Sequence, residues 1–187
     1  MLDNICPLQF IEGLNEGEEA NRSSFFDICN YPITAIEYKP KISYCLTDLE
    51  ILISVDVRNS EEFRVVLYPD YASKPNDVIL TEGILSTKPR KEITQQGIVV
   101  TADWQKVIFE QAFVVIPHNT YWIAILSERH SLRLVSAIDG RFTKILVHSN
   151  QEWKNDKCSQ DWKCMIRFYG RMLPFPNVSS NSGSEKN

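Results

Sequence analysis

Histidine and cysteine are the side chains of this sequence best suited to nucleophilic chemistry. His118, His130 and His148 stand in predicted turns or at a strand end, and none has a cysteine, serine or aspartate at an informative spacing. A Cys–His pair could be assembled only by the fold. The sequence also lacks Gly-x-Ser-x-Gly, His-Glu-x-x-His and a phosphate-binding glycine loop. We therefore predict no catalytic residues, and we expect that this protein is not an enzyme.

The five cysteines favour buried thiols over a metal site. An odd number leaves at least one thiol unpaired, and no second Cys or His pair stands at zinc-finger spacing. Two of them, Cys158 and Cys164, are close enough in sequence to form a disulfide, an alternative that stays open. The five are Cys6, Cys29, Cys45, Cys158 and Cys164.

The acidic residues give no marked site either. A glycosidase needs two carboxylates facing each other across a cleft, whereas Glu50, Asp56 and Glu110 are explained more simply as the solvent side of strands. We predict no cofactor; a structural calcium ion held by loop oxygens is the lesser alternative to a solvated loop, since no EF-hand spacing occurs. Its candidates, by residue type alone, are Asp139, Asn155, Asp156 and Asp161.

Aromatic residues in polar loops give the best binding hypothesis. Trp153 lies within the polar segment Gln-Glu-Trp-Lys-Asn-Asp, and Tyr68 and Tyr71 flank a Pro-Asp turn. Flat exposed rings with polar neighbours suit the stacking and hydrogen bonding by which sugars are bound. The alternative is that these rings only close the ends of the fold. Trp104 and Trp122 lie inside strong strand patterns and are predicted core residues.

Alternating apolar residues predict the strands that position these side chains. Apolar residues occupy every second position of residues 49–57, with Leu52 as the exception, and the alternation repeats at Phe63, Val65 and Leu67. Residues 121–126 are apolar on both faces, which predicts a central strand. Residues 84–85 are predicted to belong to a short edge strand. No amphipathic helix separates these segments.

The predicted fold is a single all-β domain, an antiparallel β-sandwich of jelly-roll type. Hydrophobic residues make up 43% and charged residues 24% of the 187, which excludes a wholly disordered chain. We expect an irregular N-terminal arm over residues 1–30, the sandwich over residues 31–173, and a flexible polar tail over residues 174–187.

Charge and termini bear on partners and location. The net charge of −4 gives no reason to expect nucleic acid or an anionic membrane surface as a partner. No run approaches the length of a membrane helix. The N-terminus lacks the basic and apolar regions of a secretory signal, so we expect synthesis in the cytoplasm.

Several strand sequences together resemble a known family. They are Val-Val-Leu-Tyr, Asp-Trp-Gln-Lys-Val-Ile-Phe, Val-Val-Ile-Pro-His-Asn-Thr-Tyr-Trp-Ile-Ala-Ile and a terminal Ile-Arg-Phe-Tyr-Gly. Their order over residues 33–170 resembles the jelly-roll accessory modules of microbial surface proteins, of the choice-of-anchor type. The resemblance implies a non-catalytic role in adhesion, sugar binding or spacing.

Two functions follow as expectations. The first is a structural or decoration subunit of a larger assembly, such as a phage virion, that works through protein–protein contacts or as a homo-oligomer. In it, loop aromatics and both terminal arms would be buried against neighbours, and ordering the arms costs entropy that a large contact surface must offset. The second is a carbohydrate-binding or adhesion module that uses Trp153, Tyr68 or Tyr71.

Overall fold

The computed structural model is built from antiparallel β-strands, and its described residues contain no helix. This confirms the all-β prediction. The described part of the chain has no helix long and apolar enough to span a membrane. The structure describes residues 7–13, 22–27, 31–55, 61–87, 92–94, 97–99, 102–127, 132–137, 144–155 and 163–173.

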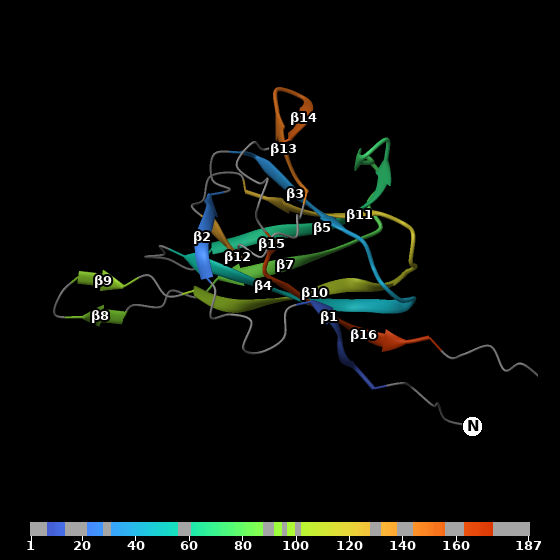
Figure 1. Cartoon of the computed structure of the whole chain (residues 1–187), viewed down its shortest axis with the longest axis horizontal. Coiled ribbons are helices and arrows are strands. Elements are labelled where there is room, and N and C mark those ends of the chain that lie inside the picture. Colours follow the sequence, from blue (N-terminus) through green and yellow to red (C-terminus); the bar gives the residue numbers. More distant parts are fainter. Residues whose placement is uncertain are drawn as a thin grey trace, which may run out of the picture.

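Ten strands follow one another in one curled sheet (Figure 1). Their spatial order is β1 (Gln9–Gly13), β16 (Ile166–Met172), β4 (Tyr44–Val55), β10 (Ala102–Val115), β7 (Thr81–Thr87), β5 (Glu61–Tyr71), β11 (Tyr121–Leu126), β3 (Ile33–Tyr38), β13 (Ile145–Ser149) and β14 (Glu152–Asn155).

Six further strands of the described residues lie off this path. Strand β12 (Leu132–Ala137) pairs with β4, with β2 (Arg22–Asp27) and with β15 (Lys163–Cys164). Strand β6 (Lys74–Pro75) pairs with the end of β5, and β8 (Glu92–Thr94) pairs with β9 (Gly97–Val99) as a separate hairpin. Figure 1 shows that hairpin projecting from one side of the molecule.

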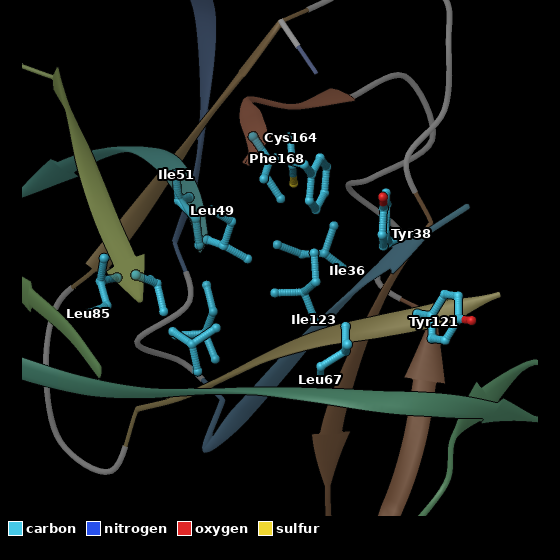
Figure 2. Close-up of a cluster of buried hydrophobic side chains, with 14 of the residues drawn as sticks. Ile36, Tyr38, Leu49, Ile51, Leu67, Leu85, Tyr121, Ile123, Cys164 and Phe168 are labelled. Carbon is cyan, nitrogen blue, oxygen red and sulfur yellow. The ribbon is translucent and has the colours of Figure 1, made fainter. Parts of the chain in front are cut away.

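The inner face of the sheet carries the main hydrophobic core. Leu49, Ile51 and Ile53 of β4 are buried there, as their alternation predicts. Figure 2 shows side chains from β3, β4, β5, β7, β11 and β16 pointing toward one another. Tyr38 of β3 stacks on Phe168 of β16 with ring centroids 4.0 Å apart. The curled sheet therefore closes over its own core.

Two sequence expectations about the strands are wrong. Residues 9–13 and 22–27, placed in an irregular arm, form β1 and β2, because each finds a partner strand, β16 and β12 respectively. Strand β7, expected at an edge, lies between β10 and β5. The predicted tail, residues 174–187, lies outside the described residues, as do Cys6, Cys29, Cys158, His130, Asp56, Asp139, Asp156 and Asp161.

Candidate binding face

The outer face of the sheet, opposite the core, carries one continuous cross-strand row. Cross-strand register partners link a residue of each of the ten strands to the next, from β1 to β14. The row, which we call the outer row, reads Phe10, Tyr169, Asp48, Ile108, Ile84, Arg64, Leu126, Ile33, His148 and Trp153.

Two exposed isoleucines occupy the middle of the outer row. Ile108 of β10 is 63% exposed, and Ile84 of β7, directly opposite it, is 48% exposed. The backbones of β7 and β10 approach closely here, since a Cβ on Gly83 would lie 2.3 Å from the carbonyl oxygen of Ile108. Glycine at position 83 therefore permits the pairing that sets the two isoleucines side by side. They form an apolar centre on strands that lie in the middle of the sheet.

Ion pairs flank this centre on both sides. Next to Ile108, the ammonium of Lys106 lies 3.2 Å from the carboxylate of Asp48, which is almost buried. Next to Ile84, the guanidinium of Arg64 donates hydrogen bonds to Glu82, with 2.7 Å between Nε and Oε2. The apolar centre thus has a rim in which each cation has a carboxylate partner.

An aromatic and charged cluster extends the face over β16, β4 and β10. The hydroxyl of Tyr169 donates a 2.7 Å hydrogen bond to Glu50 Oε2, and Arg167 Nη1 lies 3.6 Å from the same oxygen. The Arg167 guanidinium also lies 3.9 Å from the ring centre of Trp104. Phe10 contacts Tyr169 edge-on at 5.9 Å. These contacts hold the rings and charges of this region in fixed positions.

The electrostatics of this cluster favour a neutral tyrosine. Burial, the hydrogen bond to Glu50 and the negative charge of that carboxylate raise the pKa of Tyr169 to about 12. The hydroxyl therefore remains a hydrogen-bond donor at neutral pH and keeps Glu50 in place.

A small apolar cluster lies at the other end of the outer face. Trp122 is fully buried within it, and its Nε1 donates a 2.7 Å hydrogen bond to Asp70. The ammonium of Lys144 lies 5.4 Å from the Trp122 ring centre and donates a hydrogen bond to the carbonyl of Ser73. The buried members of this outer cluster are Ala35, Trp122, Ala124 and Leu146.

Two of the three predicted binding aromatics meet this outer cluster. Tyr68 and Trp153 are half-buried and both pack against it, so they share one face of the sheet. The Trp153 ring also contacts His148 edge-on, with centroids 5.0 Å apart. Burial, outweighing the lowering effect of Arg64, raises the pKa of Tyr68.

The third aromatic, Tyr71, does not join them. It ends β5 beside the Ala72–Ser73 turn, whose two residues have positive φ, and it is 72% exposed. The structure therefore brings together Tyr68 and Trp153 and leaves Tyr71 as a separate exposed ring.

The two strand tryptophans have different outcomes. Trp122 is fully buried in the outer cluster, which confirms its prediction as a core residue. Trp104 is only half-buried and lies on the outer face under Arg167, so its assignment to the core is wrong. Alternation along β10 gives both faces aromatic or apolar residues, and the sequence alone does not say which face is covered.

A polar contact at β1 was not foreseen from the sequence. The hydroxyl of Tyr38 donates to Glu12 Oε1 at 2.5 Å, and the hydroxyls of Tyr38 and Tyr44 lie 2.5 Å apart. The backbone N–H of Lys41 donates to the other carboxylate oxygen of Glu12 at 3.3 Å. Beside it is an open hollow of about 290 Å³ lined by Phe10, Ile11, Glu12, Gly13, Lys41 and Ile42. This arrangement ties β1 to the rest of the sheet.

The remaining reactive groups are separated from one another. Within the described ranges, no three His, Cys, Asp or Glu residues gather to hold a metal. Cys45 and Cys164 are free thiols, and burial raises the pKa of the Cys164 thiol to about 12. A thiol of that kind is protonated and unreactive at neutral pH.

No protein-family model, curated protein or solved structure matches this chain.

Proposed function

We propose that this protein is a non-catalytic interaction module that binds a protein partner through the outer face of its sheet. The observation that carries the proposal is the exposed pair Ile84 and Ile108 on central strands. An apolar centre within a polar rim is the usual layout of a protein–protein interface. The fixed ion pairs of Lys106 and Arg64 supply such a rim.

In this proposal the module is a structural or decoration subunit of a larger particle, such as a phage virion. A subunit of that kind needs a stable scaffold with an exposed apolar contact surface. The outer face offers one at the exposed isoleucines of β7 and β10. Protein neighbours in the particle would cover the two isoleucines.

A jelly-roll sandwich is the proposed description of the fold. It is supported by the way in which distant strands face each other across the core: Tyr38 of β3 stacks on Phe168 of β16, although the two strands are six places apart in the sheet order. A sandwich has this property, because two layers pack their inner faces together.

Sedimentation of an extract from the native source would test the proposed function. We expect the chain to travel with a large particle, and the I108K variant to travel at the 21.6 kDa of the free chain, since a buried lysine charge opposes docking. Val78, 56% exposed in the loop that precedes β7, provides the matched control V78K, which should stay with the particle. Wild-type chain found only at its own mass would contradict the proposal.

Carbohydrate binding is a second candidate, favoured by the shared face of Tyr68 and Trp153. Two half-buried rings with Lys144, His148 and Asp70 nearby combine stacking surface with polar groups. On a glycan array, the wild type should bind and W153A should not, while Y71A serves as the control because Tyr71 lies apart. Glycan binding retained by W153A would contradict this candidate.

A further inference from the structure

We infer that two copies of this chain pair edge to edge through β14, antiparallel, with Trp153 of one copy opposite Trp153 of the other. Strand β14 is last in the sheet order, and β13 is its one partner among the described strands. In Figure 1 the β13–β14 hairpin stands clear of the rest of the sheet. A free edge displays backbone N–H and C=O groups with which another strand can pair. This edge is a different surface from the exposed isoleucines, so the inference goes beyond the proposed function.

The turn before β14 shows which backbone groups of that strand are free. Asn150 and Gln151 join β13 to β14 and both have positive φ, which is the geometry of a two-residue type I′ turn. Such a turn is closed by a hydrogen-bonded pair, here Ser149 and Glu152. Hydrogen-bonded and non-hydrogen-bonded pairs alternate along an antiparallel ladder, so the N–H and C=O of Trp153 point away from β13. These are the groups with which a further strand would pair.

The two charges that flank Trp153 are complementary to those of a second copy. Glu152 and Lys154 lie on one side of the sheet, both are exposed, and neither has an ion-pair partner within the described residues. When two β14 strands pair antiparallel about Trp153, Glu152 of each copy lies directly opposite Lys154 of the other. These are non-hydrogen-bonded positions, at which opposite side chains are closest, so two ion pairs can form. The two Trp153 rings meet on the other side of the sheet.

The same charges disfavour the neighbouring registers. A pair centred on Lys154 would set Lys154 opposite its own copy, and a pair centred on Glu152 would set Glu152 opposite its own copy. The register centred on Lys154 has more backbone hydrogen bonds, but it loses both ion pairs and the contact between the tryptophans. Charges on an edge strand also oppose pairing with an apolar strand. The strand that fits this edge therefore carries the same two charges in the same order, and β14 of a second copy does so.

The opposite edge of the sheet does not have this property. The ladder between β1 and β16 is irregular between Phe10 and Glu12. Glu12 is the one charged residue of β1, and its carboxylate already accepts hydrogen bonds from Tyr38 and from the backbone of Lys41. Self-pairing through β1 would therefore have no complementary charges to set its register.

The contact is small, which determines the strength expected of it. The four residues of β14, at about 3.4 Å each, extend over about 14 Å, so the interface lies below the roughly 1,000 Å² expected of a stable dimer. We therefore expect pairing at roughly 0.1 mM chain or above. Pairing would be stronger where copies are held side by side, as in a particle, because effective concentrations there are roughly millimolar.

Light scattering on the full chain, up to roughly millimolar concentration, tests the charges. The mass should rise toward twice 21.6 kDa for the wild type, whereas E152K and K154E should each stay at the single-chain mass, because each sets like charges opposite one another. An equimolar mixture of E152K and K154E should regain the wild-type mass, since every glutamate then lies opposite a lysine. The control is I108K, which changes a charge far from β14 in the sheet order and should dimerise as the wild type does.

Two results would overturn the inference. One is a wild type that stays monomeric over the whole range of concentration. The other is a wild type that dimerises while the mixture of E152K and K154E does not, because the two charges then do not face each other across the interface. Circular dichroism should show that both variants are folded, since both side chains are exposed.

Cysteine cross-linking tests the register separately. Chains carrying E152C or K154C would be oxidised alone and as a mixture, in a C45S background with C45S alone as the control. The inferred register places position 152 opposite position 154, so the mixture should form disulfide-linked dimers faster than either variant alone. Equal or faster cross-linking by the separate variants overturns the inferred register.

The inference and the proposed function fail in different ways. A chain that is monomeric by light scattering, but whose I108K variant leaves the large particle, overturns the pairing of β14 and supports the proposed function. A chain that pairs as inferred, but is found in no particle, supports the inference and contradicts the structural-subunit role.

Discussion

The two faces of β7 and β10 place similar residues in opposite settings. Leu85 and Ile84 are neighbours on β7, yet Leu85 is fully buried in the main core and Ile84 is half exposed. On β10, Val107 is fully buried while Ile108 is 63% exposed. Because successive side chains of a strand point to opposite faces, a shift of one position separates a residue that stabilises the fold from one that is available for binding.

Paired truncations on β7 should give the largest contrast. L85A removes apolar atoms from a packed core and should lower the free energy of unfolding by about 2–5 kcal/mol. I84A removes atoms that are already half in water, and its cost should stay below about 1 kcal/mol. Urea unfolding of both variants, at concentrations where the wild type is monomeric, measures the difference. Equal losses would mean that the outer face is as tightly covered as the core.

A second contrast lies between an inner and an outer tyrosine, and alkaline pH measures it. Burial, the neighbouring Tyr44 and the contacts with Glu12 raise the pKa of Tyr38 far above its usual range, whereas the pKa of Tyr169 rises only to about 12. Unfolded tyrosine titrates near pH 10, so the stability that these hydroxyls contribute is complete below about pH 10 and declines above it.

The inner residue should extend the decline to higher pH than the outer residue does. From about pH 10 upward, a buried tyrosine such as Tyr38 should reduce the free energy of unfolding by up to about 1.4 kcal/mol per pH unit. Y38F should be less stable than the wild type at neutral pH, because Glu12 and Tyr44 lose a partner, but should decline less at alkaline pH. Y169F is the comparison: it should reduce the decline only up to about pH 12, where Tyr169 itself ionises, whereas the effect of Y38F should persist above that pH. The same slope for Y38F and the wild type would contradict the assignment.

Much of the fold could be predicted from the sequence, because alternation reports burial directly. The confirmed cases are the strand around Leu49, Ile51 and Ile53, the strand around Phe63, Val65 and Leu67, and the central strand at residues 121–126. Strands β1 and β2 were missed because short strands in a polar region depend on partners far away in the sequence. Their pairing with β16 and β12 has no local signal.

The candidate site was predictable only in part, for a related reason. Tyr68 and Trp153 were identified because aromatic residues near polar loops stand out in a sequence. Ile84 and Ile108 resemble core residues, and Trp104 has the same pattern as Trp122. Which of them faces solvent depends on strand register and on what covers each face, and both are tertiary properties.

The smallest contrast is between the two ion pairs that flank the isoleucines. Arg64 and Glu82 are 44% and 28% exposed in their side chains, so water screens the pair, and R64Q should change the stability of the monomer by less than about 0.5 kcal/mol. Asp48 is only 6% exposed, so K106Q removes the partner of a nearly buried carboxylate and should cost more, about 1 kcal/mol. In urea unfolding, R64Q should therefore match the wild type more closely than K106Q does. An R64Q variant that is clearly less stable than the wild type would show that Arg64 supports the fold.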